Sequence, residues 1–465
     1  MMNVSVNTDP NAPRPALLIK NGRVIDPASG RDEIADVLVG NGVVLAVGVL
    51  SAAEVTAHLS EAGAALPSAL TSGASFQEID AKGFWVTPGI VDLAARLREP
   101  GYEYKATLES EMQAALSGGV TSLCCPPDTD PPLDEPGLVE MLKHRARTLD
   151  QARLYPLGAL TSGLKGEVIT EMAELAEAGC VGFSQAFFPL HDTQVLVRAM
   201  EYAKTFEFTL WLHPQDAALA RGGVAHAGPV AGRLGLPGVP VMAETVALFT
   251  IFEAVRATGC RVHLCRLSSA QGVQMLRAAR AEGLPVTADV SVHHLHFTDL
   301  DIGFFDSNLR VDPPFRTQRD REALCLGLVD GTIDAICSDH TPVEDDGKLL
   351  PFAEAEPGVT ALELLLPLSL MWAESQKLAP IELLRHLTES PRRVLGQSSS
   401  AVGLSPGAIA DLVIIDPEHH WQCSPKVLLS QGKHTPFNGY ELKGRVQATV
   451  VGGRMAFRAP AQPVA

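Results

Sequence analysis

A regular alternation of short β-rich runs with helical segments constrains the fold of this chain more than any other feature. Each run is followed by a segment with helical periodicity, such as TLESEMQAALSGG or AQGVQMLRAARAEG. The eight runs are WVTPGIVDL, GVTSLCC, ARLYPLGAL, GCVGFSQAF, FTLWLHPQD, RVHLCRLSS, LPVTADVSVHH and DAICSDHTP. Eight β-then-α units predict a closed parallel (β/α)8 barrel and not an open doubly wound sheet.

The two ends of the chain show the pattern of small antiparallel strands. Alternating runs separated by Asn-Gly and Pro-containing turns extend from about Leu17 to Phe84, and GAIADLVIIDPEHHW and GRVQATVVGGRMAF repeat this style near the carboxyl end. We therefore expect both ends to share one small sheet domain. An Ala/Ser-rich insert at about residues 51–75 predicts a short helix followed by a loose loop.

Charge and cysteine usage narrow the class of protein. The formal net charge is −17 and there is no block of Lys or Arg, which disfavours nucleic-acid and anionic-membrane partners. The eight cysteines include no CxxC pair, so we expect reduced, buried thiols in a cytoplasmic protein, with the adjacent Cys124 and Cys125 filling the core. No export signal and no long apolar run is visible, and no glycine-rich phosphate loop follows a strand.

Long motifs along nearly the whole chain resemble the dihydroorotase family of cyclic amidohydrolases. They are NGRVIDPASG, PGIVDL, LREPGYEYKATLES, PPDTDP, YPLGALT, HHLHFTD, VDPPFRTQRDREAL, DGTIDAICSDHTP and HTPFNGYELKGRVQATVVGGR. The resemblance implies an α/β fold, the (β/α)8 TIM-type barrel of the amidohydrolase superfamily. It places the barrel domain at residues 88–399 and a small composite β-sandwich domain at residues 1–87 and 400–465.

The resemblance also implies six metal-ligand positions, which in the family hold one or two divalent ions that acidify a bound water. Two positions keep a ligand, His213 and Asp339. The four positions that lose their ligand are Ala94, Arg96, Gln185 and Arg266. We therefore expect no zinc or other cofactor and a vestigial Asp339. The guanidinium groups of Arg96 and Arg266 are predicted to fill the volume of the metals and to pair with Asp339.

The positions that grip the substrate carboxylate in the family are altered as well. Arg98 and His340 are retained, whereas Asp128 and Asp312 stand where the family has asparagine. Because two anions replace amide donors, poor binding of an anionic pyrimidine is expected. Arg98 has a second interpretation, in which it anchors the loop after the first strand by pairing with a carboxylate such as Asp128.

Other polar residues admit a structural explanation beside a chemical one. His213 fits a hydrogen-bonded remnant of the metal site better than a working ligand. The histidines of VHHLHF, which are His293, His294 and His296, suggest a relocated metal site. However, alternation along a strand would send His293 and His294 to opposite faces.

Together these features predict a catalytically inactive, dihydroorotase-like protein of pyrimidine biosynthesis. The resemblance implies a structural subunit that holds the catalytic chain of aspartate carbamoyltransferase, and at least a homo-oligomer. The alternative is an active cyclic amidohydrolase with a rearranged zinc site that uses Asp339 with His340 or His213. A third possibility is a pocket with Arg96, Arg98 and Arg266 that senses an anionic metabolite. Whether the segment VEDDGKLLPFAEAEPG closes over the old pocket or docks onto another subunit is left open by the sequence.

Overall fold

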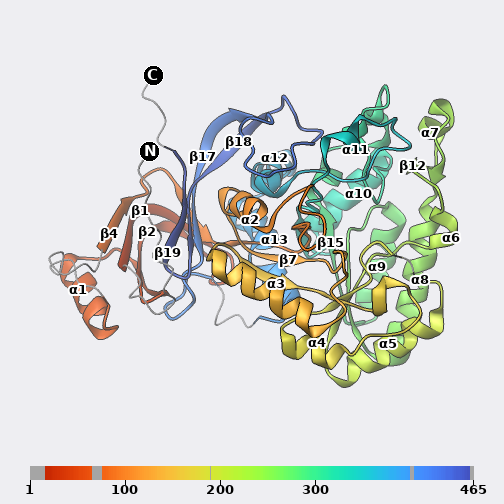
Figure 1. Cartoon of the computed structure of the whole chain (residues 1–465). Helices are drawn as coiled ribbons and strands as arrows, with labels where there is room; N and C mark the ends of the chain where they lie inside the picture. Colours follow the sequence, from red (N-terminus) through yellow and green to blue (C-terminus); the bar gives the residue numbers. More distant parts are fainter. Residues whose placement is uncertain (1–15, 65–75, 189, 398–402, 461–465) are drawn as a thin grey trace.

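The computed structural model describes residues 16–64, 76–188, 190–397 and 403–460, and within them the predicted barrel is present (Figure 1). All neighbouring barrel strands are parallel, and a bridge between Ala95 and His340 joins the first strand to the last. The barrel strands are β6 (Ile90–Asp92), β7 (Val120–Cys125), β8 with β9 (Arg153–Pro156 and Gly158–Ala159), β10 (Phe183–Ser184), β11 (Thr209–Leu212), β14 (Arg261–Leu264), β15 (Val286–Ser291) and β16 (Ala335–Cys337). The prediction of a (β/α)8 barrel is confirmed.

Helices pack around these strands because each presents one apolar stripe to the barrel. In α9 (Ala270–Ala281), for example, Val273, Leu276 and Ala279 are buried at helical spacing, and the Ser269 hydroxyl caps the first turn by accepting from Gly272 N at 3.0 Å. The other longer barrel helices are α2 (Leu108–Ser117), α3 (Pro136–Leu149), α4 (Met172–Ala178), α5 (Thr193–Thr205), α8 (Val241–Thr258), α10 (Gln318–Val329), α12 (Leu365–Gln376) and α13 (Pro380–Leu387). Short helices are α6 (Ala217–Ala220), α7 (Pro229–Leu234), α11 (Asp345–Leu349) and α14 (Glu389–Val394).

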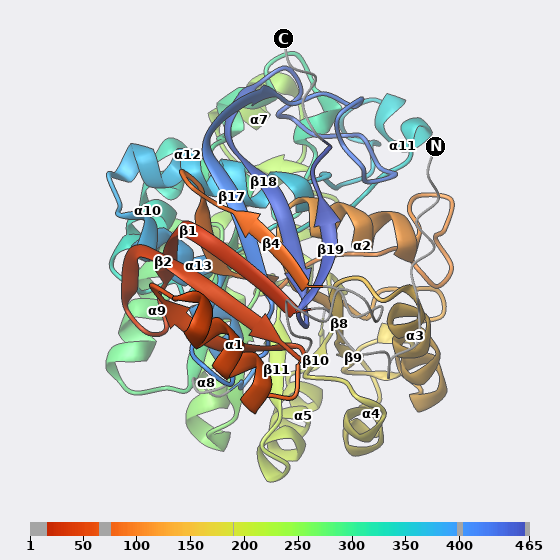
Figure 2. The ribbon, with the colours of Figure 1, turned by 90° about the vertical axis from the view of Figure 1, so that its left-hand side faces the viewer.

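Strands from both ends of the chain form one sheet beside the barrel, as predicted (Figure 2). Its order is β19-β18-β17-β5-β1-β2-β3, and β4 pairs with β1. The bounds are β1 (Ala16–Asp26), β2 (Arg31–Gly40), β3 (Val43–Gly48), β4 (Phe76–Asp80), β5 (Trp85–Pro88), β17 (Leu412–Gln422), β18 (Glu441–Val451) and β19 (Arg454–Arg458). Because β5 ends at Pro88 and β6 begins at Ile90, this sheet leads directly into the first barrel strand.

The helix predicted in the Ala/Ser-rich insert is α1 (Ala52–Glu61). It begins with a capping box, in which Ser51 and Glu54 satisfy each other's backbone N–H groups, and it buries Val55 and Leu59. The predicted loose loop falls mostly at residues 65–75, which lie outside the described residues.

Burial accounts for the cysteines as predicted. All eight are buried free thiols, and Cys124 and Cys125 lie in the packed barrel interior. Burial raises the pKa of Cys125 to about 12, so this thiol stays protonated and serves as an apolar core residue. Among the described helices, none combines the length and the apolar character needed to cross a bilayer.

Candidate active site

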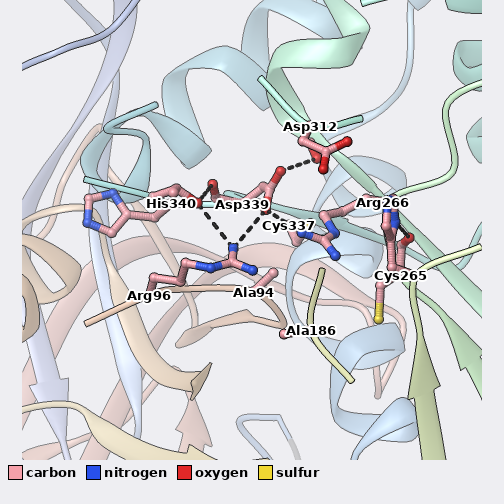
Figure 3. Close-up of polar contacts among 12 residues, drawn as sticks. Ala94, Arg96, Ala186, Cys265, Arg266, Asp312, Cys337, Asp339 and His340 are labelled. Atoms are coloured by element: carbon pink, nitrogen blue, oxygen red, sulfur yellow. Dashed lines mark hydrogen bonds and ion pairs between the residues drawn. The ribbon is translucent and has the colours of Figure 1, made fainter. Parts of the chain in front are cut away.

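The carboxyl ends of β6, β14 and β16 bring two cations and one carboxylate together in the barrel mouth (Figure 3). Oδ1 of Asp339 lies 3.4 Å from Nη1 of Arg266 and 3.5 Å from Nη1 of Arg96. Ser291 Oγ donates to the second carboxylate oxygen at 3.1 Å. The predicted pairing of both guanidinium groups with Asp339 is therefore present, and both oxygens of this carboxylate are engaged.

An aromatic ring that sequence reasoning missed lies between the two arginines. The guanidinium carbon of Arg96 lies 4.1 Å from the Phe187 ring centroid, and that of Arg266 lies 4.0 Å away. These distances are those of cation–π contacts, which strengthen where water is excluded. Phe187 thus closes the barrel mouth over the cation pair. Its place two residues after Gln185 in GFSQAFF was the available signal.

Asp128 is held by Arg96 and not by Arg98. Arg96 Nε donates to Asp128 Oδ2 at 2.7 Å, and both side chains are almost fully buried. Burial by itself would raise the pKa of Asp128, but the guanidinium of Arg96, together with the more distant charge of Arg98, outweighs it and lowers that pKa. Arg98 Nε donates to the carbonyl of Pro342 at 2.9 Å, and among the described residues no carboxylate forms an ion pair with Arg98. The expected pairing of Arg98 with a carboxylate is wrong, although Arg98 does anchor its loop.

His213 lies at the end of β11 with its ring beside Phe187, at 5.7 Å between centroids. Nδ1 lies 3.4 Å from the carbonyl of Cys265, and Nε2 is a buried atom without a hydrogen-bond partner. Burial and the charge of Arg266 lower the pKa of His213 to about 4, so the ring is neutral near pH 7. A neutral ring with a free Nε2 keeps the capacity to accept one further hydrogen bond.

Gln185 holds two loops together. Its Oε1 accepts from Thr161 Oγ1 at 3.0 Å, and its Nε2 donates to the carbonyl of Leu164 at 2.8 Å. Because both ends of its amide are held by these neighbours, Gln185 acts as a structural residue. Ala94, also at a strand end, is buried and contributes only its backbone, whose carbonyl accepts from Ser338 Oγ at 3.2 Å.

His340 follows Asp339 directly, but its side chain points away from the cation pair (Figure 3). Nε2 lies 2.6 Å from Glu111 Oε2, and Nδ1 accepts from the backbone N–H of Ala361 at 3.1 Å. Both His340 and Glu111 are completely buried. The expectation that His340 belongs to the pocket is therefore corrected, because its ring links α2 to the segment before α12.

The adjacent histidines His293 and His294 do not lie in a strand. They belong to a 3-10 turn, Val292–Leu295, and their rings are 5.0 Å apart and both contact Phe315. The prediction that strand alternation separates His293 and His294 is therefore wrong, since they lie in a 3-10 turn and both rings pack against Phe315. Burial lowers the pKa of His293 well below its usual value, and that of His296 to about 4. His296 lies with Nε2 3.0 Å from the carbonyl of Leu368, so the three histidines do not converge on one ion.

Four residues at the barrel mouth have a left-handed backbone, which is unfavourable for residues other than glycine. They are Arg98 (φ 63°), Ala186 (φ 52°), Arg266 (φ 58°) and Asp339 (φ 48°). Asp289 stabilises one of them, because its Oδ1 accepts from the backbone N–H of Arg266 at 2.6 Å. Such strained residues cluster where a fold positions side chains for a site, and here they aim the charged groups inward.

The space beside Asp339 is nearly filled. A cavity of about 10 Å³ remains there, lined by Phe187, His293, Asp312, Asp339 and the segment Pro357–Val359, among others. This volume is at the lower limit for a single water molecule. Asp312 is also contacted by Gln215, whose Nε2 lies 3.4 Å from its Oδ1. On the other side of Phe187, a larger cavity of about 400 Å³ lies between β11, α5 and α8.

A second group of metal-ligand types lies deeper in the barrel and was not singled out from the sequence. Ligand atoms of His263, Cys265 and Asp289 lie within 4.8 Å of one another. Both nitrogens of His263 are already engaged, with Asp289 Oδ2 at 3.0 Å and Thr287 Oγ1 at 2.8 Å. Burial raises the pKa of Cys265 above the usual range, so its thiol is protonated. This group forms a hydrogen-bonded core.

Comparison with known proteins places the chain in a family. Residues 83–272 match a family described as Dihydro-orotase-like. A Dihydroorotase-like protein of Pseudomonas aeruginosa is 41% identical over 94% of this chain and 98% of its own length. This chain belongs to the dihydroorotase-like family. A Dihydroorotase of Geobacter sp. is 38% identical over 95% of this dihydroorotase-like chain and 99% of its own length.

Solved structures show the same fold for this dihydroorotase-like chain. An L-hydantoinase (dihydropyrimidinase) of Arthrobacter aurescens superposes with a TM-score of 0.79 at 23% identity, covering 94% of this chain and 95% of the other. A D-hydantoinase of Thermus sp. superposes with a TM-score of 0.77 at 22% identity, covering 95% of each chain. A (β/α)8 barrel with an added sheet is thereby the fold that this chain shares with both structures.

The residues around Asp339 do not fit the metal that this fold family implies. A divalent ion needs several converging carboxylates or neutral imidazoles. Asp339 contacts Ser291 Oγ and two guanidinium groups, which have no lone pair to donate, and one neutral imidazole, with Nε2 of His293 3.9 Å from Oδ2. One carboxylate and one imidazole beside two fixed cations are too few ligands for such an ion. Arg96 Nη2 and Arg266 Nε are buried without hydrogen-bond partners, so the cations here already outnumber the acceptors that face them, and both guanidinium groups would repel an added metal ion.

Proposed function

We propose that this dihydroorotase-like chain of pyrimidine biosynthesis is catalytically inactive and serves in the cytoplasm as a structural subunit of aspartate carbamoyltransferase. The observation that carries the proposal is Asp339 held between Arg96 and Arg266. In this arrangement the carboxylate neutralises fixed cations and is not free to act as a base. A homo-oligomer of the chain is part of the same proposal.

Chemical reasoning supports the absence of catalysis. Hydrolysis of a cyclic amide at neutral pH needs an activated water, and an arginine cannot supply hydroxide because it keeps its proton. The cavity of about 10 Å³ beside Asp339 also has no room for a pyrimidine ring. The same lack of room speaks against a pocket that senses an anionic metabolite at this point.

The second candidate is an active cyclic amidohydrolase with a rearranged zinc site. Two observations favour it: a relative named Dihydroorotase is 38% identical to this chain, and His263, Cys265 and Asp289 lie close together. For these three to hold zinc, the hydrogen bond between His263 and Asp289 must break and the Cys265 thiol must lose its proton. Both requirements oppose binding.

Turnover distinguishes the two candidates. The purified chain is assayed in both directions between carbamoyl aspartate and dihydroorotate while zinc is titrated, with Asp339→Ala as the matched control. We expect neither the wild type nor Asp339→Ala to give a rate above that of buffer with zinc alone, at any zinc concentration. A rate that needs both zinc and Asp339 would establish the second candidate and overturn the first.

Association is tested separately with the purified catalytic chain of aspartate carbamoyltransferase from the same organism. Light scattering after size-exclusion chromatography measures the mass of each protein alone and of the mixture. The proposal expects one larger species of defined stoichiometry. Two unshifted peaks at micromolar concentrations of both chains would contradict the structural role.

A further inference from the structure

Five large apolar side chains are exposed on two segments at the mouth of the barrel, and we call them the apolar rim patch. Leu300, Phe304 and Phe305 follow β15, and Leu349 and Leu350 belong to the segment that follows β16. Phe304 is fully exposed and Leu349 is 80% exposed. Large clusters of exposed apolar side chains are rare on monomeric proteins and usually mark a surface that binds a partner.

Hydrogen bonds join the two segments into one surface. Ser307 Oγ donates to the carbonyl of Lys348 at 2.6 Å, and Lys348 Nζ donates to the carbonyls of Ser307 at 3.0 Å and Arg310 at 3.2 Å. Lys348 is almost completely buried by these contacts. Leu349, the last residue of α11, and Leu350 therefore follow directly on a residue that is tied to the segment carrying Phe304 and Phe305. Figure 1 shows the place of α11 in the fold.

The backbone presents the aromatic pair outward at a cost. Phe305 has a φ of 65°, in the left-handed region that is unfavourable for an aromatic residue, and it follows Gly303 with a φ of 56°. Because both phenylalanines are exposed, burial of their rings within the chain does not offset this unfavourable backbone conformation. Aromatic side chains of this kind are the residues that most often dominate binding at protein interfaces.

The exposed charged side chains of these two segments are all acidic. The carboxylates of Asp301, Asp306, Asp346 and Glu354 belong to the same two stretches of chain as the apolar rim patch, and none of them forms an ion pair with a described residue. Lys348 is the one basic residue in 299–309 and 344–356, and it is buried. A partner with an apolar centre and a rim of Lys and Arg would complement this surface.

The charge also decides between possible occupants. In a symmetric contact between two copies of this chain, the same patch faces itself, so the four carboxylates of each copy would lie against those of the other. Repulsion between them disfavours a second copy. An anionic membrane is disfavoured for the same reason.

We propose that the apolar rim patch is the surface through which this chain docks onto the transcarbamoylase chain, by means of an apolar, basic-rimmed face of that partner. The inference rests on the proposed function and adds the location and chemistry of the contact. The segment after β16 then has two roles. Pro357–Val359 line the small cavity beside Asp339, and the exposed Leu349 and Leu350 contact the partner.

The test compares affinities of full-length variants for the purified transcarbamoylase catalytic chain by biolayer interferometry. The double variant Phe304→Ser/Leu349→Ser should weaken binding at least about tenfold, because it removes the two most exposed anchors. The matched control is Phe249→Ser, which changes another exposed phenylalanine, on α8. It should bind as the wild type does. Circular dichroism and thermal unfolding verify that all variants remain folded.

Charge reversal provides an independent readout. Asp346→Lys/Glu354→Lys should weaken binding several-fold at low salt and should flatten the dependence of affinity on salt concentration. If the wild type binds and all variants bind equally, the docking surface is overturned and the proposed function stands. If the wild type does not bind at all, the proposed function fails. If patch variants dissolve a homodimer without affecting the transcarbamoylase, the occupant is a second copy and the inference is wrong.

Discussion

Nη1 of Arg266 lies 3.4 Å from Oδ1 of Asp339, at a depth of the barrel where both side chains are 5% exposed. Truncating Arg266 removes one of the two cations that compensate the buried Asp339 carboxylate and leaves only Arg96 opposite it. Arg266→Ala should therefore lower the free energy of unfolding by about 3 kcal/mol near neutral pH. Urea unfolding of the variant against the wild type measures the difference.

A double variant serves as the control for this prediction. Arg266→Ala/Asp339→Ala removes both charges, and we expect it to be less destabilised than the sum of the two single variants. If the loss in the double variant equals the sum of the losses in the two single variants, Arg266 and Asp339 do not interact, contrary to the proposed role of this pair.

Phe187 separates two cavities and contacts both guanidinium groups. Phe187→Ala should destabilise the protein by about 2 kcal/mol, because it removes two cation–π contacts and leaves a void between the cavities. Phe188→Ala changes the exposed neighbour and should cost less than about 0.5 kcal/mol. Differential scanning calorimetry of thermal unfolding compares the stability of the two variants. A similar loss in both variants would argue against Phe187 as the plug of the barrel mouth.

The lowered pKa of His213 predicts that the stability of the protein depends on pH. Its pKa in the folded protein is about 4, lowered from 6.5 by burial and by Arg266. Between pH 6.5 and pH 4, His213 is protonated in the unfolded chain but stays neutral in the folded protein. Protonation therefore favours the unfolded chain, and the free energy of unfolding falls as the pH falls from 6.5 towards 4. Above pH 6.5 the effect disappears.

The measurement is the change in unfolding free energy between about pH 7 and about pH 5, by urea titration. His213→Gln should lose about 2 kcal/mol less than the wild type over this range, since glutamine does not titrate. His144→Gln, which changes an exposed histidine, is expected to keep the dependence of the wild type. An unchanged dependence in His213→Gln would mean that the ring is solvated in the folded protein.

His340 is predicted to be a structural residue. His340→Ala breaks the bond with Glu111 and leaves that carboxylate buried without its partner, so a loss of about 3 kcal/mol is expected. Glu109→Gln, on the exposed side of the same helix, should be neutral. Denaturation in urea measures both, and binding to the transcarbamoylase chain should survive in any His340→Ala protein that remains folded. A stable variant that loses binding would place His340 in a functional role.

The sequence by itself determined the order of elements and the identity of the charged residues at the strand ends. Alternation and helical periodicity are local properties, so the eight β-then-α units and the strands of both termini were visible without the structure. The pairing of Arg96 and Arg266 with Asp339 was also predicted, but from the resemblance to the dihydroorotase family, which assigns all three residues to metal-ligand positions.

Only the tertiary structure decided which way individual side chains point and what fills the space between them. His340 turns to Glu111, Phe187 enters between the arginines, and His293 lies in a 3-10 turn. Each outcome depends on partners far away in the sequence, or on a single φ angle such as that of Asp339. The position of a side chain in a close-packed interior depends on many residues that are distant in the sequence, and local sequence patterns do not specify which of them it contacts.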